Sequence, residues 1–153
     1  MPIQFTGLPT DAVIDIRESG IDAYGNAVER HHAPGGTYPC RHCLDQTSED
    51  YLVLAHRPFV GVNPYAETGP IFLCAEACDA YVPSAAVPDI LRSPAYIVRA
   101  YSAEERIVYG TGQVTPTDEI RRYAERLFEA PDVAFVDVRS AANNCFQCRI
   151  LRV

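Results

Sequence analysis

The strongest hydrophobic pattern in the chain is an amphipathic segment at residues 115–130. Along TPTDEIRRYAERLFEAP the apolar side chains recur every three or four residues, which is the period of one helix face. Thr115 is a suitable N-cap, Pro116 suits the first helical position, and Pro131 ends the pattern. Arg121 lies four residues before Glu125 on the polar face, a spacing that supports an exposed helix surface. We therefore predict a helix at about 115–130 that serves as scaffold.

Shorter apolar runs have the features of strands. VAFVDV at 133–138 is almost continuously apolar and rich in β-branched residues, as expected of a strand covered on both faces. CFQCRILRV at 145–153 alternates between two faces, which is typical of a half-buried strand. Further strands are predicted at 51–57, 69–75, 95–101 and 105–110, the last two joined as a hairpin.

The remaining segments complete a prediction of fold class. Pro9, Thr10 and Asp11 open a short helix that runs through Arg17 and ends before Gly20. Segments 22–36 and 82–94 contain many of the Gly and Pro residues and are predicted to be loops. Strands on both sides of one clear helix predict a single α+β domain over residues 1–153, with a mainly antiparallel sheet and one or two short helices besides the clear one.

Composition and charge narrow the class of protein. The chain has 153 residues, of which 48% are hydrophobic and 22% charged, so it can bury a core. Its formal net charge of −7 argues against a nucleic-acid partner. Because the sequence shows neither a secretory leader nor a run of about 18 apolar residues, we expect a soluble cytoplasmic protein without a membrane partner. No pattern indicates the oligomeric state.

The six cysteines form three close pairs, and the first two pairs resemble a metal site. Cys40 and Cys43 follow the C-x2-C spacing of a zinc knuckle, and Cys74 and Cys78 could supply two further thiolates. The 30 residues between the pairs make this spacing looser than that of a zinc ribbon, and His42 or His56 could replace either later cysteine. Free cysteine is also a common core residue, so reduced buried thiols are the favoured interpretation and zinc is the alternative.

The third pair has a different geometry. Cys145 and Cys148 would point to opposite faces of a strand and could not share an ion unless the strand begins after Cys145. Arg139 could then favour the thiolate of Cys145. Asn143 and Asn144 could equally form an ordinary turn, and we favour that interpretation, because no sequence-adjacent base is present.

Three segments contain most of the Arg, His and Cys residues outside regular periodicity, namely the 38–45 turn, the 56–70 loop and the 139–145 loop. We expect them to combine into one functional surface. His31 and His32 are expected to be simply exposed, and YGTG at 109–112 lacks the spacing of a phosphate loop. The candidate ligand-binding residues are Arg41, His42, His56, Arg57, Tyr65, Glu67, Arg139, Asn144 and Cys145.

Several short stretches also resemble a known family. YPCRHCL, HRPF, PYAETGPIF, LRSPAYIVRAY, YGTG and VRSAANNCF occur in an order and spacing similar to those of bacterial proteins known as domain of unknown function 1203. The resemblance extends from about Pro2 to Val153. It implies a bacterial single-domain protein, and it implies no activity, cofactor or catalytic residue.

Three classes of function remain open. The leading interpretation is a module that binds a small ligand, which could be anionic, through Arg41, Arg57 and Arg139. The alternative is a zinc-stabilised structural or interaction domain that uses Cys40, Cys43, Cys74 and Cys78. The third is a thiol enzyme or redox protein, and it is the weakest because no base, orienting acid and oxyanion donors occur together in the sequence.

Overall fold

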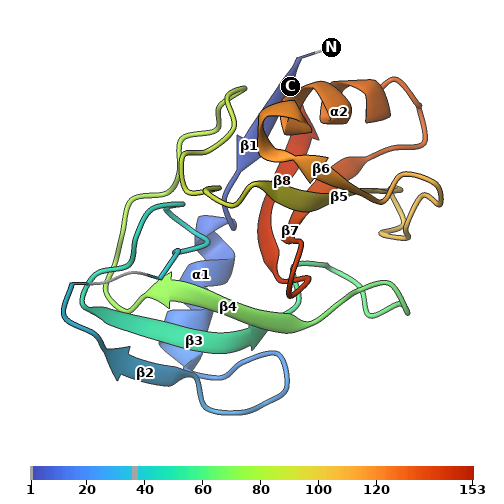
Figure 1. The fold of residues 1–153 in the computed structure, drawn as a ribbon. Coiled ribbons are helices and arrows are strands. Elements are labelled where there is room, and N and C mark those ends of the chain that lie inside the picture. Colours follow the sequence, from blue (N-terminus) through green and yellow to red (C-terminus); the bar gives the residue numbers. More distant parts are fainter. Residues whose placement is uncertain (1, 36–37) are drawn as a thin grey trace.

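The computed structural model describes residues 2–35 and 38–153, and it confirms the α+β class. The described residues form two antiparallel sheets, two α-helices and one 3-10 turn (Figure 1). In chain order the elements are β1 (Ile3–Thr6), α1 (Thr10–Ser19), β2 (Glu29–His32), β3 (Asp50–His56), β4 (Gly69–Cys74), β5 (Ala95–Tyr101), β6 (Gln113–Pro116), η1 (Thr117–Glu119), α2 (Ile120–Leu127), β7 (Phe135–Ser140) and β8 (Phe146–Arg152). No helix of the described chain has the length and apolar character needed to cross a membrane.

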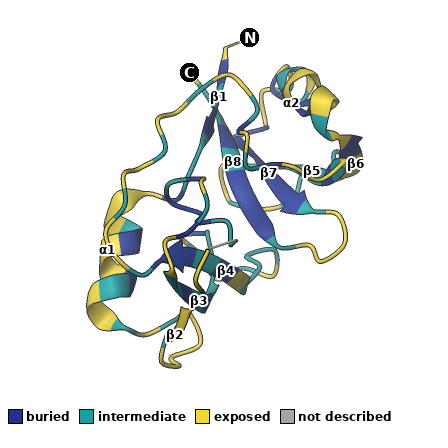
Figure 2. Ribbon diagram, turned by 60° about the vertical axis from the view of Figure 1, so that its left-hand side comes forward, coloured by how far each residue is buried: buried dark blue, intermediate teal, exposed yellow. Residues whose placement is uncertain are grey.

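The larger sheet has the strand order β1-β8-β7-β5-β6. Helix α2 packs on one of its faces, and the buried side chains of Ile120 and Ala124 join a core that includes Val98, Val138 and Ile150. Burial of these apolar side chains is the main source of stability in this half of the molecule. Figure 2 shows that β7 and β8 are buried along most of their length, as the apolar run of β7 predicts.

The smaller sheet has the order β2-β3-β4, and α1 packs against it (Figure 1). Val13 and Ile16 of α1 belong to the same core as Leu52, Leu54 and Ile71. Leu52 and Leu54 are two residues apart and therefore lie on one face of β3. The chain leaves the larger sheet after β1 and returns to it through the segment between β4 and β5.

The short helix predicted from Pro9 to Arg17 is confirmed, and it extends to Ser19. Gly20 follows in the left-handed region with φ 66°, and its backbone N–H donates to the carbonyl of Ile16. Glycine adopts this conformation without a side-chain clash, which is why the helix ends there.

The prediction for residues 115–130 was partly wrong. Thr115 is no helix N-cap, because it lies in β6 opposite Tyr96 of β5, and its hydroxyl donates to the carbonyl of Gln113. The helical part begins with η1 and becomes α-helical only at Ile120. Proline lacks a backbone N–H, and it is compatible with an edge strand because the solvent side of such a strand needs no N–H donor. Pro116 can therefore end a strand as readily as it begins a helix.

The predicted strand at 105–110 was wrong, because Glu105 adopts a left-handed φ of 61° and one isolated bridge, between Tyr101 and Ile107, takes the place of a strand. The predicted reversal of the chain after β5 is present, since the N–H of Ser102 donates to the carbonyl of Arg106 at 2.8 Å. The loop prediction for 22–36 missed β2, an exposed edge strand whose sequence ERHH has no apolar alternation to reveal it. Residue 36 lies outside the described part of the chain, as does residue 37. The loop prediction for 82–94 is confirmed.

The face of the five-stranded sheet opposite α2 contains a row of charged side chains. Arg99 of β5, Asp137 of β7 and Arg149 of β8 lie at the same register. Nε and Nη2 of Arg149 donate to the fully buried Asp137 carboxylate at 2.6 and 2.9 Å. Such a bidentate pair keeps both charges compensated in the region between the two sheets.

Candidate metal centre

Four cysteine side chains from two distant segments converge at one point. Cys40, Cys43, Cys74 and Cys78 have Sγ atoms that all lie within 4.8 Å of one another. The Sγ atoms of Cys40 and Cys78 are 3.9 Å apart, too far for a disulfide bond. Four sulfurs at about 2.3 Å from a central ion form a tetrahedron with edges of roughly 3.8 Å. The cluster therefore has the size of a four-thiolate metal site.

The local fold explains how this arrangement forms. Cys40 and Cys43 lie in a tight turn in which the N–H of Leu44 donates to the carbonyl of Cys40 at 2.9 Å, with Leu44 at a left-handed φ of 52°. The N–H of Arg41 donates to the carbonyl of Phe72 at 3.0 Å and so fixes the turn beside β4. Because β4 ends at Cys74, this bond places the two cysteine pairs next to each other.

Further donors surround the sulfurs. The backbone N–H of Cys74 donates to Sγ of Cys40 at 3.4 Å, and Nη2 of Arg17 donates to Sγ of Cys78 at 3.5 Å. The same guanidinium contacts the carbonyl of Cys74 at 2.9 Å. Donors of this kind stabilise thiolates, and the positive charge of Arg17 offsets part of the negative charge of a thiolate cluster.

His42 is a neighbour of the cluster and is not part of the four-sulfur group. Its Nδ1 lies 3.2 Å from Sγ of Cys78, and its Nε2 lies 2.9 Å from Oγ1 of Thr10. If the Thr10 hydroxyl donates to Nε2, Nδ1 is the protonated nitrogen and donates to the sulfur. Burial lowers the pKa of His42, which favours this neutral form. Neither His42 nor His56, which the sequence left open as a replacement for a later cysteine, belongs to the four-sulfur group.

The thiols share charge unequally without an ion. Hydrogen bonds from Cys43 and Cys74 lower the pKa of Cys40, whereas the interaction with Cys40 raises the pKa of Cys43 far above its ordinary value. The pKa of Cys74 is raised to about 11, chiefly by its interaction with Cys40. These opposite shifts indicate that the thiols interact strongly with one another.

The three loops expected to form one surface do so only in part. Glu67 joins two of them, because its carboxylate accepts from Arg139 at 3.0 Å and from Nδ2 of Asn144 at 3.2 Å. Arg99 contributes a third bond to Glu67 at 2.6 Å. The 38–45 turn belongs to the metal centre instead. Its Arg41 is buried, and the guanidinium reaches the carbonyl of Gln147 at 3.5 Å.

Arg41, Arg57 and Arg139, the three predicted anion donors, have different contacts in the structure. Arg139 is buried against Glu67 and Asn144, with Nη1 lacking a partner among the described residues. Arg57 lines a cavity together with His56. Tyr65 contacts the hydroxyl of Tyr109 at 2.5 Å.

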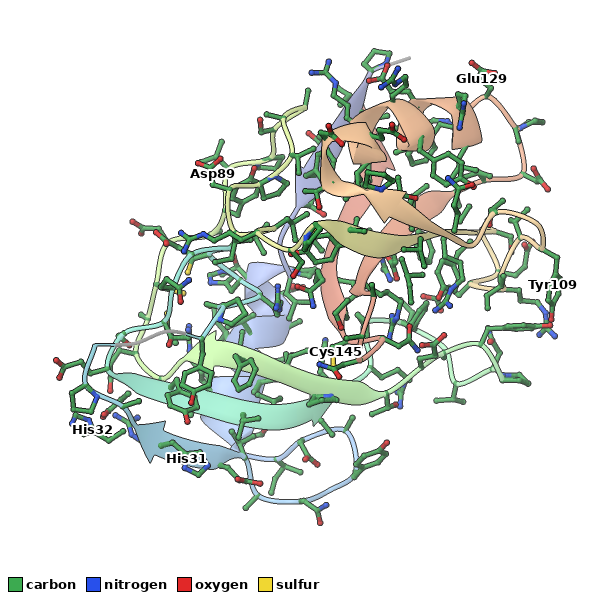
Figure 3. The ribbon with its side chains drawn as sticks, viewed as in Figure 1. His31, His32, Asp89, Tyr109, Glu129 and Cys145 are labelled. Atoms are coloured by element: carbon green, nitrogen blue, oxygen red, sulfur yellow. The ribbon has the colours of Figure 1, made fainter. Side chains whose placement is uncertain are left out.

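The third cysteine pair is divided between loop and core. β8 begins after Cys145, which leaves this residue in the β7–β8 connection, where Figure 3 shows it facing the three-stranded sheet. Asn144 has the left-handed φ of 55° that the turn interpretation predicts. Burial raises the pKa of Cys148 to about 12, which makes this thiol a poor nucleophile.

The exposed histidines are confirmed as surface residues. Figure 3 shows His31 and His32 on the outer strand β2. They pair with the carboxylates of Glu29 at 2.9 Å and Asp50 at 2.5 Å.

Sequence reasoning missed three residues that shape these sites. Arg17 and Thr10 reach the cysteine cluster from α1, and no local spacing signals such a contact. Asp137 had a usable signal, because a carboxylate within the apolar run VAFVDV requires a buried partner, which is Arg149.

Comparison with known proteins identifies the family of the chain and does not identify an activity. The sequence model of a family described as "Protein of unknown function (DUF1203)" matches residues 37–152. No curated protein and no solved structure matches the chain.

Proposed function

Because the chain belongs to the DUF1203 family, whose description states no activity, we propose its role from the geometry of the cysteine cluster. The protein is a zinc-binding domain in which Cys40, Cys43, Cys74 and Cys78 hold one Zn²⁺ that stabilises the fold. The observation that supports this most strongly is the approach of all four Sγ atoms to within 4.8 Å of one another.

The donor set favours zinc over other ions. Four thiolates are soft ligands, and a tetrahedral sulfur site selects Zn²⁺ or an iron–sulfur centre over magnesium or calcium. Four protein ligands also fill the coordination of zinc and leave no position for a substrate. A structural role follows from this closed arrangement, whereas a catalytic zinc would need an open position.

Charge compensation supports the same role. Four thiolates and one Zn²⁺ have a net charge of −2, so a buried site needs nearby donors. Arg17, His42 and the backbone N–H of Cys74 lie at hydrogen-bond distance from the sulfurs. They would orient the ligands and reduce the cost of the charge.

The ion would act as a cross-link that adds to the backbone hydrogen bond between Arg41 and Phe72. It would join the 38–45 turn to the end of β4 and to the loop that follows it. Because an unfolded chain does not offer a preformed site, the free energy of zinc binding adds to the free energy of folding.

Metal content and thiol accessibility test this proposal together. Protein purified without a metal-affinity step should contain one zinc per chain, with four thiols protected from a thiol reagent until a chelator is added. Cys78→Ser should remove the zinc. Cys145→Ser is the matched control and should retain it, since Cys145 lies outside the cluster. Zinc-free native protein with full stability would contradict the proposal.

The measurement of thiol accessibility also distinguishes a structural zinc site from the reactive thiol of an enzyme. A reactive thiol would be alkylated rapidly near pH 6 in the native protein. Protection of the four cluster cysteines by zinc predicts slow alkylation that becomes fast only after chelation.

A further inference from the structure

A second site lies away from the cysteines, in a cavity of about 440 Å³ between the five-stranded sheet and the loop after β3. This volume is within the range of small-molecule sites in proteins. Leu151 of β8 and Leu8 form part of its wall, and Phe59 and Val60 come from the loop. Phe146 adds a buried aromatic ring. Most of the wall is thus apolar.

Arg57 is the polar group in this wall that lacks a partner. Its Nε is buried and has no hydrogen-bond partner among the described residues, and no carboxylate there lies within the 4.0 Å of a salt bridge. A buried donor without a partner costs free energy. The Nε atom itself is enclosed by protein, so a ligand would interact with Arg57 through the charge of its guanidinium, which lines the cavity without a carboxylate partner.

Arg149 also lines the cavity, but its charge is already compensated. Asp137 accepts from Nε and Nη2, and Nη2 also donates to the carbonyl of Pro58 at 2.7 Å. The guanidinium is stacked on Phe135, with 3.9 Å from its central carbon to the ring centroid. Arg149 is therefore a fixed part of the wall.

His56 lies beside these arginines in a neutral state. Burial, and to a smaller extent the charges of Arg57 and Arg149, lower its pKa to about 4. The ring makes no hydrogen bond to a described residue, and it lines the cavity. A neutral imidazole can donate one hydrogen bond to an anion without adding charge.

Glu105 holds the loop that covers the cavity. Its carboxylate accepts from the backbone N–H of Val60 at 2.9 Å and of Gly61 at 2.7 Å. Asn63 adds bonds to the carbonyls of Glu104 and Glu105, both at 3.1 Å. The loop is thus ordered before any ligand arrives, which lowers the entropic cost of binding.

The charge balance selects the ligand. Arg57 is one uncompensated cation, while Glu105 places a carboxylate in the same wall. A doubly charged phosphate would meet too little positive charge and would approach Glu105. We propose that this cavity binds a small organic monocarboxylate, whose carboxylate contacts Arg57 and His56 and whose apolar body lies against Leu8, Phe59 and Phe146.

Calorimetric titration of the zinc-loaded protein with straight-chain carboxylates from butanoate to octanoate tests this proposal. Each added methylene should tighten binding about fourfold while the cavity has room, as expected for burial of a CH2 group. Octanol and octylamine should bind at least tenfold more weakly than octanoate, because neither supplies the anion.

Arg57→Gln should weaken octanoate binding at least tenfold. Arg92→Gln is the matched control, since Arg92 is exposed and lies outside the cavity, and it should leave octanoate binding unchanged. Arg57→Gln should change the unfolding temperature by no more than Arg92→Gln does. Equal affinity for octanoate and octanol would overturn the proposal. So would equal losses in the two variants, tighter binding of inorganic phosphate, or no carboxylate binding at millimolar concentration.

Discussion

The backbone N–H of Leu8 donates to the carbonyl of Arg41 at 2.8 Å, and this bond connects the two sites of the molecule. Leu8 lines the cavity, whereas Arg41 lies between Cys40 and His42 in the turn that contributes Cys40 and Cys43 to the four-cysteine cluster. The β1–α1 connection therefore touches both the cavity and this turn. A change in the turn should be transmitted to one wall of the cavity.

Gly7 lies at this junction, and an added methyl group should destabilise it. A Cβ at Gly7 would be 2.5 Å from the carbonyl oxygen of His42, which is backbone and cannot move aside easily. Gly7→Ala should lower the free energy of unfolding by about 1–3 kcal/mol, as overpacking does elsewhere. It should also weaken zinc binding, because the displaced turn contains two ligands. Chemical denaturation and zinc titration measure both effects.

Gly69→Ala is the control for Gly7→Ala. A Cβ at Gly69 would meet no atom within 4 Å. Its stability and zinc affinity should stay close to those of the parent protein. Equal effects of the two substitutions would contradict a specific close contact at Gly7.

His42 should affect zinc affinity through the hydrogen bond to Cys78. Removing such a partner of a metal ligand typically costs about 10- to 100-fold in metal affinity. His42→Leu should show this loss in a competition titration with a chromogenic chelator. His42→Asn places an amide N–H near the position of Nδ1 and should recover most of the affinity. If His42→Leu and His42→Asn have the same zinc affinity as each other, the hydrogen bond from His42 does not support Cys78 as a zinc ligand.

His56 predicts a pH dependence of stability with a defined sign. Its folded-state pKa of about 4 is below the ordinary 6.5, so the unfolded chain binds the proton more readily. The contribution to stability is therefore complete above pH 6.5 and is lost as the pH falls toward 4. The full effect is about 3 kcal/mol.

Comparison with His56→Gln isolates this contribution from the loss of zinc in acid. The stability of the variant relative to the parent should rise by up to about 3 kcal/mol between pH 7 and pH 4. Denaturation curves at several pH values measure this difference. A difference that is constant with pH would show that His56 titrates normally in the folded protein.

The pair of Arg149 and Asp137 should be strongly coupled. Arg149→Met leaves the fully buried Asp137 carboxylate without its partner and should cost about 3–5 kcal/mol. Replacing both residues, with Asp137→Leu added, should be less harmful than Arg149→Met alone. A double variant as unstable as the single one would indicate that Arg149 acts mainly through its aromatic contacts.

The sequence predicted local features better than contacts between distant segments. Gly20 ended α1 as expected, because a helix C-cap depends on one backbone conformation. Thr115 was misassigned, since a Thr-Pro pair suits the end of an edge strand as well as the start of a helix. Strand β2 was missed because pairing with β3, and not its own composition, determines its conformation.

In the candidate sites, too, local features could be predicted from the sequence and contacts between distant segments could not. The C-x2-C spacing of Cys40 and Cys43 is a local signal, and it kept a zinc site open as the alternative to buried thiols. Its assembly with Cys74 and Cys78 depends on the bond between Arg41 and Phe72, which no local pattern reveals. Arg41, Arg57 and Arg139 were grouped because a guanidinium can bind an anion, and the sequence does not reveal that Arg139 contacts Glu67.

X-ray absorption at the zinc edge of the purified protein tests the central claim most directly. Binding by Cys40, Cys43, Cys74 and Cys78 predicts one shell of four sulfur atoms at about 2.3 Å from the metal. A shell that contains nitrogen or oxygen at about 2.0–2.1 Å would contradict the four-cysteine site. Protein that contains no metal and keeps its stability in chelator would contradict it equally.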